Sequence, residues 1–189
     1  MPEYVPGWHH QYMNAAISRM ISENLRRLIV SMPPRHGKSE LISRRLPALL
    51  LGQDPDCTVI ASSYSAELAS RMNRDCQRIM TSSEYGILFP ESKLNESNAR
   101  TTSGSWLRNS DVFEIVGRKG SYRSSGVGGG ITGMGARWLI VDDPIKNREE
   151  ADSVTYRNKI WDWYTSTLYT RQSPDARILV VMTRWHSVS

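Results

Sequence analysis

A glycine, a lysine and a serine follow one another at Gly37, Lys38 and Ser39, within the stretch SMPPRHGKSE. They match the end of the phosphate-binding pattern G-x-x-x-x-G-K-[ST], whose backbone N–H groups cradle phosphate oxygens. In that pattern the lysine reaches the β- and γ-phosphates and the hydroxyl ligates Mg²⁺. The first glycine would fall at position 32, where this chain has Met32. These residues predict nucleotide binding by an altered loop, and the alternative is a chance Gly-Lys-Ser in a surface turn.

Two acids, Asp142 and Asp143, can supply the second part of this chemistry. They follow the apolar run at residues 138–141, which predicts a buried strand. Asp142 can hold Mg²⁺ through its water shell, and Asp143 can polarise an attacking water. The alternative is a strand that leads into an Asp-Pro turn, a common feature of α/β proteins.

A hydroxyl, Thr183, follows a third apolar run at residues 179–182 and can sense a γ-phosphate; the alternative is a solvated strand end. The apolar run at residues 27–32 predicts a strand directly before the Gly-Lys-Ser, and residues 39–51 predict a helix after it. This strand–loop–helix context is the one that the phosphate-binding pattern requires. Because parallel strands bring the loops at their carboxyl ends to one edge of a sheet, we expect these groups to meet there.

The rest of the chain supplies the elements that must position these groups. Strands alternate with helices, so we predict an α/β fold, a three-layer sandwich with a largely parallel central sheet. Residues 81–110 are expected to be irregular, and the glycine-rich residues 117–135 are expected to form a flexible loop or hairpin. Further helices are predicted at 11–25, 66–80 and 152–171, and further strands at 58–62, 111–116 and 177–182.

Composition limits the class of protein. The chain has 189 residues, 39% of them apolar and 23% charged, which predicts one globular domain. Its 24 Lys and Arg against 19 Asp and Glu give a net charge of +5, which permits a nucleic-acid partner without establishing one. Cys57 and Cys76 lack metal-type spacing, so we expect no disulfide scaffold and a reducing compartment. No apolar run approaches a membrane span, and the first residues lack an export signal.

Four strings together resemble one protein family: MPPRHGKSEL, VIASSYSAELASRMNRDCQRIM, GVGGGITGMGARWLIVDDPIKNREEA and VVMTRWH. In this order they resemble the N-terminal ATPase domain of the large terminase subunit of tailed bacteriophages, over about residues 4–186. The resemblance implies a P-loop NTPase fold of the additional-strand (ASCE) type. It also implies an enzyme that uses ATP and Mg²⁺ to drive double-stranded viral DNA into an empty procapsid.

Roles follow from the resemblance position by position. The catalytic residues would be Asp143, where relatives often carry Glu, with Lys38, Arg35 and Thr183. Ser39 and Asp142 would hold the metal. Trp8 and His9 lie in a segment that resembles the adenine-contacting one, although Trp8 can equally pack on the first helix. The full set expected to bind nucleotide is Pro34, Arg35, His36, Gly37, Lys38, Ser39, Glu40, Trp8 and His9.

The chain departs from the family at Thr132-Gly133, where many terminases carry an Arg-Gly whose arginine acts on the neighbouring subunit. The nearest candidates for that arginine finger are Arg137 and Arg123; the alternative for each is a solvated or strand-flanking arginine. Helical spacing predicts a basic stripe that could contact DNA, unless it is only the solvated face of a helix. The candidate DNA contacts are Arg71, Arg74 and Arg78 in that stripe, with Arg118 and Lys119 elsewhere.

The resemblance also predicts organisation and partners. We expect an adenine-contacting segment at about residues 1–26, an ATPase core at about 27–189, and no nuclease domain, hence no DNA cleavage by this chain. The implied partners are double-stranded viral DNA, the portal protein and the small terminase subunit, in a ring of about five copies in the host cytoplasm; the isolated domain could be monomeric. Two alternatives stay open: a helicase-like P-loop ATPase, and a truncated nucleotide- or DNA-binding module with little hydrolysis.

Overall fold

The computed structural model describes residues 5–96, 106–131 and 133–185. Over these residues the chain forms a six-stranded sheet in which neighbouring strands are parallel except at the β3–β4 edge. The strands lie in the order β1 (Arg27–Ser31), β6 (Gln172–Met182), β5 (Ala136–Asp142), β2 (Thr58–Ser63), β4 (Ser121–Gly126) and β3 (Val112–Glu114). β6 lies between β1 and β5, so an additional strand separates the strand before Gly-Lys-Ser from the strand before the two acids.

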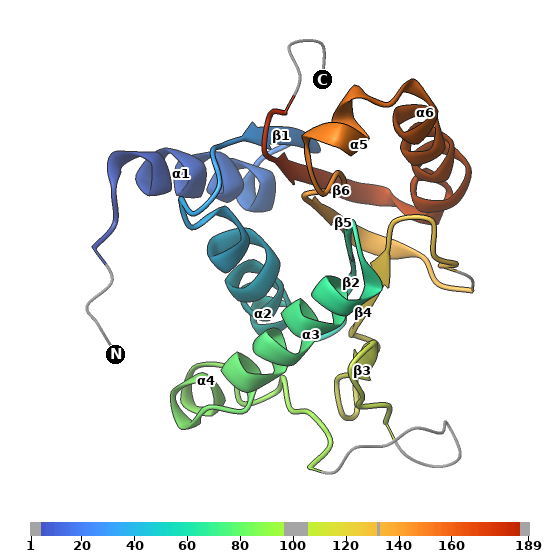
Figure 1. Ribbon diagram of the computed structural model, residues 1–189. Coiled ribbons are helices and arrows are strands. Elements are labelled where there is room, and N and C mark those ends of the chain that lie inside the picture. Colours follow the sequence, from blue (N-terminus) through green and yellow to red (C-terminus); the bar gives the residue numbers. More distant parts are fainter. Residues whose placement is uncertain (1–4, 97–105, 132, 186–189) are drawn as a thin grey trace.

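Helices cover both faces of this sheet (Figure 1). On one face, α1 (Trp8–Ser22), α2 (Leu46–Gln53) and α3 (Ala66–Met80) enclose an apolar cluster, to which Ile140 of β5 contributes. On the other face, α6 (Val154–Trp163) and the turn that follows it cover a second cluster, to which Leu139 contributes. Neighbouring residues of a strand thus face opposite layers, as a doubly covered sheet requires. The predicted three-layer α/β sandwich is confirmed.

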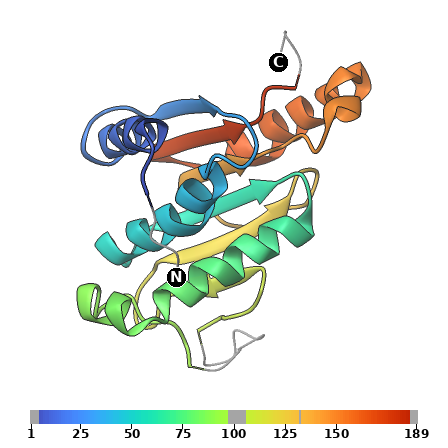
Figure 2. The same ribbon diagram turned by 60° about the vertical axis from the view of Figure 1, so that its left-hand side comes forward.

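The carboxyl ends of four neighbouring strands share one edge of the sheet. Ser31 of β1 is in register with Met182 of β6, and Ser63 of β2 with Asp142 of β5. The view in Figure 2 shows these strands side by side with α2 and α3 in front of them. The loops that leave these strand ends carry the predicted site residues, so the topology brings them to one edge.

The sequence prediction holds best where local signals are strong. The helix predicted at residues 66–80 is α3, and the hydroxyl of Ser65 caps it by accepting a hydrogen bond from the N–H of Leu68 at 3.2 Å. The predicted strands at 27–32, 58–62, 138–141 and 177–182 correspond to β1, β2, β5 and β6, although β6 begins earlier, at Gln172. The first helix, expected at residues 11–25, lies earlier, at Trp8–Ser22.

The segment of residues 117–135, predicted as a flexible loop or hairpin, supplies one strand of an antiparallel hairpin, and the place of that strand in the central sheet was not predicted. The strand is β4, which pairs with β2 in parallel and with β3 in antiparallel fashion. Tyr122 is fully buried and its ring stacks on that of Phe113 at 5.2 Å between centroids. Gly126 ends the strand where a Cβ would lie 2.7 Å from the backbone nitrogen of Ala66, so the glycine permits close packing of α3. Tertiary pairing therefore determines this strand.

Two predicted helices are subdivided. The first, expected at residues 39–51, begins with a π-helical segment, η1 (Glu40–Arg45), and continues as α2. The second, expected at 152–171, comprises α6, the π-helical η2 (Tyr164–Leu168) and the 3-10 turn η3 (Tyr169–Arg171), with the short α5 (Arg148–Asp152) before it. Residues 81–110, predicted to be irregular, contain α4 (Ser83–Leu88) in their described part.

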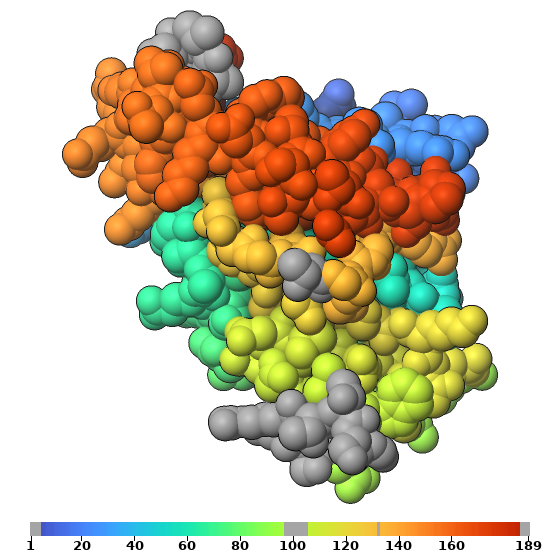
Figure 3. Space-filling view, turned by 90° about the vertical axis from the view of Figure 1, so that its right-hand side faces the viewer, coloured from blue at the N-terminus to red at the C-terminus, as the bar shows by residue number. Residues whose placement is uncertain are grey.

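The face in Figure 3 carries the segment after residue 148 in its upper half and β3, β4 and the glycine-rich loop in its lower half. Trp163 is buried in this layer, whereas Trp161 and Tyr169 are exposed, so the aromatic-rich segment is only partly core. Cys57 and Cys76 are both buried and free of disulfides. No helix within the described ranges is long and apolar enough to cross a membrane.

Candidate nucleotide site at the carboxyl edge of the sheet

The loop after β1 has a constrained backbone. Arg35 has φ = +62° and Gly37 has φ = +76°, both in the left-handed region. For arginine this conformation is unusual, whereas glycine adopts it without steric cost. The helix begins at the end of this loop, where the N–H of Leu41 donates to the carbonyl of Gly37 at 3.1 Å. The loop therefore delivers its residues to a helix N-terminus, where backbone N–H groups attract phosphate.

His10 of α1 fixes this loop from outside. Its Nδ1 accepts a hydrogen bond from the N–H of Gly7 at 3.1 Å, so its Nε2 carries the proton and donates to the carbonyl of His36 at 3.0 Å. A Cβ added at Gly37 would lie 2.5 Å from Nε2 of His10. The glycine is thus required both by its backbone angle and by the histidine beside it. The sequence analysis did not select His10, because this contact joins residues far apart in the chain.

Lys38, Asp143 and Thr183 converge at the same edge. The Nζ of Lys38 lies 2.7 Å from Oδ2 of Asp143 and donates to Oγ1 of Thr183 at 3.0 Å. The other oxygen of Asp143, Oδ1, accepts the N–H of Thr183 at 2.8 Å. The side chain of Lys38 is only 7% exposed, so its charge depends on these partners. Asp143 itself has φ = +45°, a strained backbone of the kind that clusters at functional sites.

Asp142 points into the interior beside this group and is 1% exposed. Its Oδ2 accepts the hydroxyl proton of Ser43 at 2.6 Å, while its buried Oδ1 has no hydrogen-bond partner among the described residues. Burial raises the pKa of the Asp142 carboxyl above its ordinary value, and the hydroxyls of Ser43 and Ser39 oppose that shift. A buried carboxylate oxygen without a partner is costly unless a ligand completes it.

This arrangement fits a magnesium ion shared with a nucleotide. No group of three or more His, Cys, Asp or Glu side chains gathers into a metal site within the described ranges. Mg²⁺ is usually held by one or two protein ligands together with substrate phosphates and waters, not by an all-protein cage. Oδ1 of Asp142, which has no hydrogen-bond partner among the described residues, and the hydroxyl of Ser39 would supply such a small ligand set. Both residues were predicted as metal ligands from the sequence.

Four further predicted nucleotide contacts lie at the surface of this edge. Trp8 is 80% exposed at the start of α1, so it does not take part in the packing of that helix. The rings of His9 and His36 are 5.6 Å apart, which places α1 beside the phosphate-binding loop. Arg35 is exposed on that loop, with no ion pair shown in the described part of the chain.

Both arginine-finger candidates lie away from this site. Arg137 is next to the start of β5, at the opposite end of the strand from Asp142, where it pairs with Asp54 and, at 2.9 Å, with Asp175. Arg123 lies within β4, and its buried Nε has no hydrogen-bond partner among the described residues. Thr132, where the family pattern would place the arginine, lies outside the described residues. The finger assignments therefore stay predictions.

The candidate DNA contacts are likewise spread over the surface. Arg71, Arg74 and Arg78 lie on the exposed face of α3, and Arg78 pairs with Asp75 at 2.6 Å. Arg118 pairs with Glu91, and Lys119 donates its backbone N–H to Asp56 at 2.8 Å. The structure does not bring these basic residues to one place.

Sequence reasoning also missed Ser43. It lies four residues after Ser39 in the helix predicted at residues 39–51, a spacing that places two side chains on one helical face. That spacing could have indicated that Ser43 lies near the predicted metal ligand Ser39. In the structure the hydroxyl of Ser43 donates to Asp142.

Comparison with known proteins identifies a family for this chain. Residues 29–189 match the family described as terminase large subunit, T4likevirus-type, N-terminal. No curated protein sequence matches the chain. The large terminase ATPase domain of Thermus phage P74-26 is 12% identical with a TM-score of 0.50, over 95% of this chain and 70% of that chain. An arginine-to-alanine mutant of that domain gives 12% identity, a TM-score of 0.48 and the same coverage. At 12% identity, the likeness to the unmutated domain concerns the fold alone. The family match, in contrast, spans most of the sequence, and the chain therefore belongs to the family of T4-like terminase large subunits, N-terminal part.

Proposed function

We propose that this chain is the ATP-hydrolysing motor domain of a phage terminase large subunit, and that hydrolysis powers translocation of double-stranded viral DNA into the procapsid. The observation that carries the proposal is the convergence of Lys38, Asp143 and Thr183 beside the partly unpaired carboxylate of Asp142. Membership of the family supports the same chemistry.

Binding would begin with an exchange of partners at Lys38. In the structure its ammonium is neutralised by Asp143 at 2.7 Å. The β- and γ-phosphates of ATP would compete for that charge, while the N–H groups at the start of η1 orient the phosphate chain. Release of Lys38 would leave Asp143 ionised, held through Oδ1 by the N–H of Thr183. Arrival of the nucleotide would in this way activate the carboxylate of Asp143.

Hydrolysis would then depend on Asp143 as the base that orients a water molecule and accepts its proton. Asp142 and Ser39 would hold Mg²⁺, whose chemistry here is to neutralise charge on the phosphate oxygens. Thr183 contacts both Lys38 and Asp143, so it is placed to report the state of the γ-phosphate to β6 and the segment that follows. This would be the γ-phosphate-sensing role that the sequence suggests for Thr183.

We further propose that work on DNA requires an assembly of several copies, with the portal protein and small terminase subunit as partners in the host cytoplasm. An arginine from a neighbouring copy that stabilises the charge of phosphoryl transfer would be worth about 10³–10⁵ in rate. Within the described residues, Arg137 is already held by two carboxylates. Arg35 is exposed on the phosphate-binding loop and has no ion pair shown in the described part of the chain. It could therefore contact a nucleotide without first breaking an ion pair, which Arg137 could not.

The test is ATP hydrolysis by the purified chain with Mg²⁺ over a range of protein concentrations, beside Asp143→Ala and the exposed-acid control Asp162→Ala. Turnover that rises faster than linearly and is lost only in Asp143→Ala would indicate a site completed by a neighbour. Linear turnover, again lost only in Asp143→Ala, would place all catalytic groups in one chain. Turnover that survives Asp143→Ala would contradict the proposal.

A second candidate is a nucleotide-binding module with little hydrolysis. The observation that favours it is the Lys38–Asp143 pair, because a base neutralised by a buried lysine is inactive until the pair separates. Tight ATP binding without turnover, at every protein concentration and in the presence of DNA, would support this module and exclude the motor function for the chain on its own.

A further inference from the structure

Ser43 is a fully buried polar residue that the proposed reaction does not use directly. Its side chain is 0% exposed, and its hydroxyl donates to Oδ2 of Asp142 at 2.6 Å, the short distance of a charge-assisted hydrogen bond. The other oxygen of the same carboxylate, Oδ1, is also buried and has no hydrogen-bond partner among the described residues. One oxygen of the carboxylate is therefore fixed by the protein and the other is left open.

The backbone around Ser43 is also unusual. It lies in η1, where the N–H of Leu46 donates to the carbonyl of Leu41, five residues back, in the π-helical pattern. Single π-helical turns are uncommon and occur frequently at functional sites. The side chain of Ser43 reaches from this turn to the end of β5, so it ties the helix after the phosphate-binding loop to the strand that carries both acids.

We propose that Ser43 is a positioning residue for the metal: by holding Oδ2 of Asp142, it directs the free Oδ1 toward the ion shared with the nucleotide. This inference rests on the proposed function, since it assumes that Asp142 is a metal ligand. Groups that hydrogen-bond a metal ligand orient it, and their removal typically weakens metal affinity about 10- to 100-fold. Without Ser43 the carboxylate could rotate away from this orientation.

Ser92 offers a matched control. It is 2% exposed and donates at 2.6 Å to the backbone carbonyl of Leu51, remote in sequence from the strand ends that carry the site. Ser43→Ala and Ser92→Ala thus remove the same buried hydroxyl and a hydrogen bond of the same length. A role confined to stability predicts similar effects of the two substitutions.

The experiment measures Mn²⁺ binding to the complex with a non-hydrolysable ATP analogue, by electron paramagnetic resonance. Ser43→Ala is expected to weaken Mn²⁺ binding about 10-fold or more. Binding of the analogue with the metal chelated should be unchanged, and Ser92→Ala should bind Mn²⁺ as the wild type does. Ser43→Cys keeps a weak donor of similar size, so its Mn²⁺ affinity should lie between those of Ser43→Ala and the wild type. This variant replaces Ser43→Ala in the experiment if Ser43→Ala does not fold.

Steady-state hydrolysis supplies a second readout. Excess Mg²⁺ should restore the kcat of Ser43→Ala, because the defect is in metal affinity and not in the reacting groups. Unchanged Mn²⁺ affinity in Ser43→Ala and Ser43→Cys, or a loss that Ser92→Ala equals, would overturn the positioning role while leaving the proposed function intact. If the wild-type complex binds no Mn²⁺ at all, the metal site and the proposed function fail together.

Discussion

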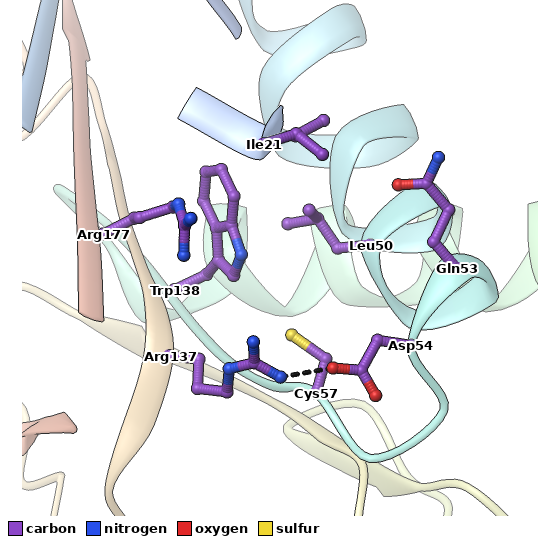
Figure 4. Close-up of a pocket in the computed structure, with 8 residues that line it drawn as sticks. All are labelled: Ile21, Leu50, Gln53, Asp54, Cys57, Arg137, Trp138 and Arg177. Carbon is purple, nitrogen blue, oxygen red and sulfur yellow. Dashed lines mark hydrogen bonds and ion pairs between the residues drawn. The ribbon is translucent and has the colours of Figure 1, made fainter. Parts of the chain in front are cut away.

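The charged residues that define the two ends of the sheet differ in how completely they are paired within the protein. At the carboxyl end, one buried oxygen of Asp142 has no hydrogen-bond partner among residues 5–96, 106–131 and 133–185, and Lys38 is held by groups that a phosphate can replace. At the amino end, a pocket of about 210 Å³ is lined by Arg137, Arg177 and Trp138 (Figure 4). There Arg137 pairs with two carboxylates, and Arg177 donates to backbone carbonyls while its guanidinium lies over the ring of Trp138 at 5.7 Å.

Backbone strain follows the same division. The non-glycine residues with positive φ in the described parts of the chain are Arg35 and Asp143, and both belong to the carboxyl end. At the carboxyl end, the combination of strain with an incompletely paired carboxylate indicates where a ligand can complete the structure, whereas the paired charges of Arg137 serve the fold. The comparison predicts large functional effects at the carboxyl end and small effects on stability at the amino end.

Asp143→Asn should have the largest effect. Loss of the base is expected to lower kcat about 10²- to 10⁴-fold. Lys38 loses its competing carboxylate in the same variant, so nucleotide should bind about fivefold more tightly, the equivalent of about 1 kcal/mol. Hydrolysis and fluorescent-nucleotide titration measure the two effects, with Asp162→Asn as the exposed control. Wild-type turnover would contradict the role of Asp143, and unchanged affinity would show that the ion pair does not oppose binding.

Gly37→Ala should come next, through the loop backbone. A non-glycine residue at φ = +76° costs about 1–3 kcal/mol, and the new Cβ would also meet His10 at 2.5 Å. If the strain moves the loop, nucleotide should bind about 10- to 100-fold more weakly. Gly130→Ala is the control, since a Cβ there meets nothing within 4 Å.

The double variant His10→Ala with Gly37→Ala separates the two causes. Partial recovery of nucleotide affinity would assign part of the loss to the contact with His10, and no recovery would assign the loss to φ. Wild-type affinity in Gly37→Ala itself would mean that the loop does not hold phosphate in the observed conformation.

How far the sequence could predict the fold is clear from α3 and β4. The bounds of α3 were predicted residue for residue, because its capping serine and its apolar spacing lie within the segment itself. β4, with the sequence SYRSSG, has no apolar run, and its conformation depends on pairing with β2 and β3 on either side. Such pairing joins residues far apart in the chain, which local patterns do not report.

The site shows the same limit. Lys38, Asp142, Asp143 and Thr183 were predictable because each follows an apolar strand, and parallel strands gather their carboxyl ends. The contact of His10 with the loop was not predictable, since it depends on how α1 packs. Neither was the ion pair between Lys38 and Asp143, which gives the proposed catalytic carboxylate a partner within the chain.

Arg137→Ala tests the amino end. Its side chain is 39% exposed, so loss of its two ion pairs should lower the free energy of unfolding by only about 1 kcal/mol, measured by urea denaturation. Turnover should not change. Arg148→Ala, which removes an 80% exposed arginine paired at 3.6 Å, should affect neither quantity. A folded Arg137→Ala protein that has lost concentration-dependent turnover would make Arg137 the finger and break the comparison between the two ends.

The smallest effects are expected from substitutions on α3 and concern DNA binding. Here the comparison between paired and unpaired charges applies to single arginines. Arg71, Arg74 and Arg78 share one exposed helical face, but in the described structure only Arg78 has an ion-pair partner, Asp75 at 2.6 Å. If incomplete pairing indicates a ligand, Arg71 and Arg74 contact DNA phosphates and Arg78 does not.

Each of Arg71→Ala and Arg74→Ala should then reduce the salt dependence of duplex-DNA binding by about one unit of slope in a plot of log K against log[salt]. Arg78→Ala should change that slope less, because Asp75 already neutralises the charge that is removed. Thermal unfolding should be nearly unchanged in all three, since exposed substitutions usually alter stability by less than about 0.5 kcal/mol. Equal slopes for all three variants would mean that pairing does not mark ligand contacts on this helix, and an unchanged slope in each would make the stripe a solvated face. A smaller slope in Arg71→Ala and Arg74→Ala, but not in Arg78→Ala, would instead place DNA against α3. This helix begins directly after β2, and the carboxyl end of β2 adjoins Asp142.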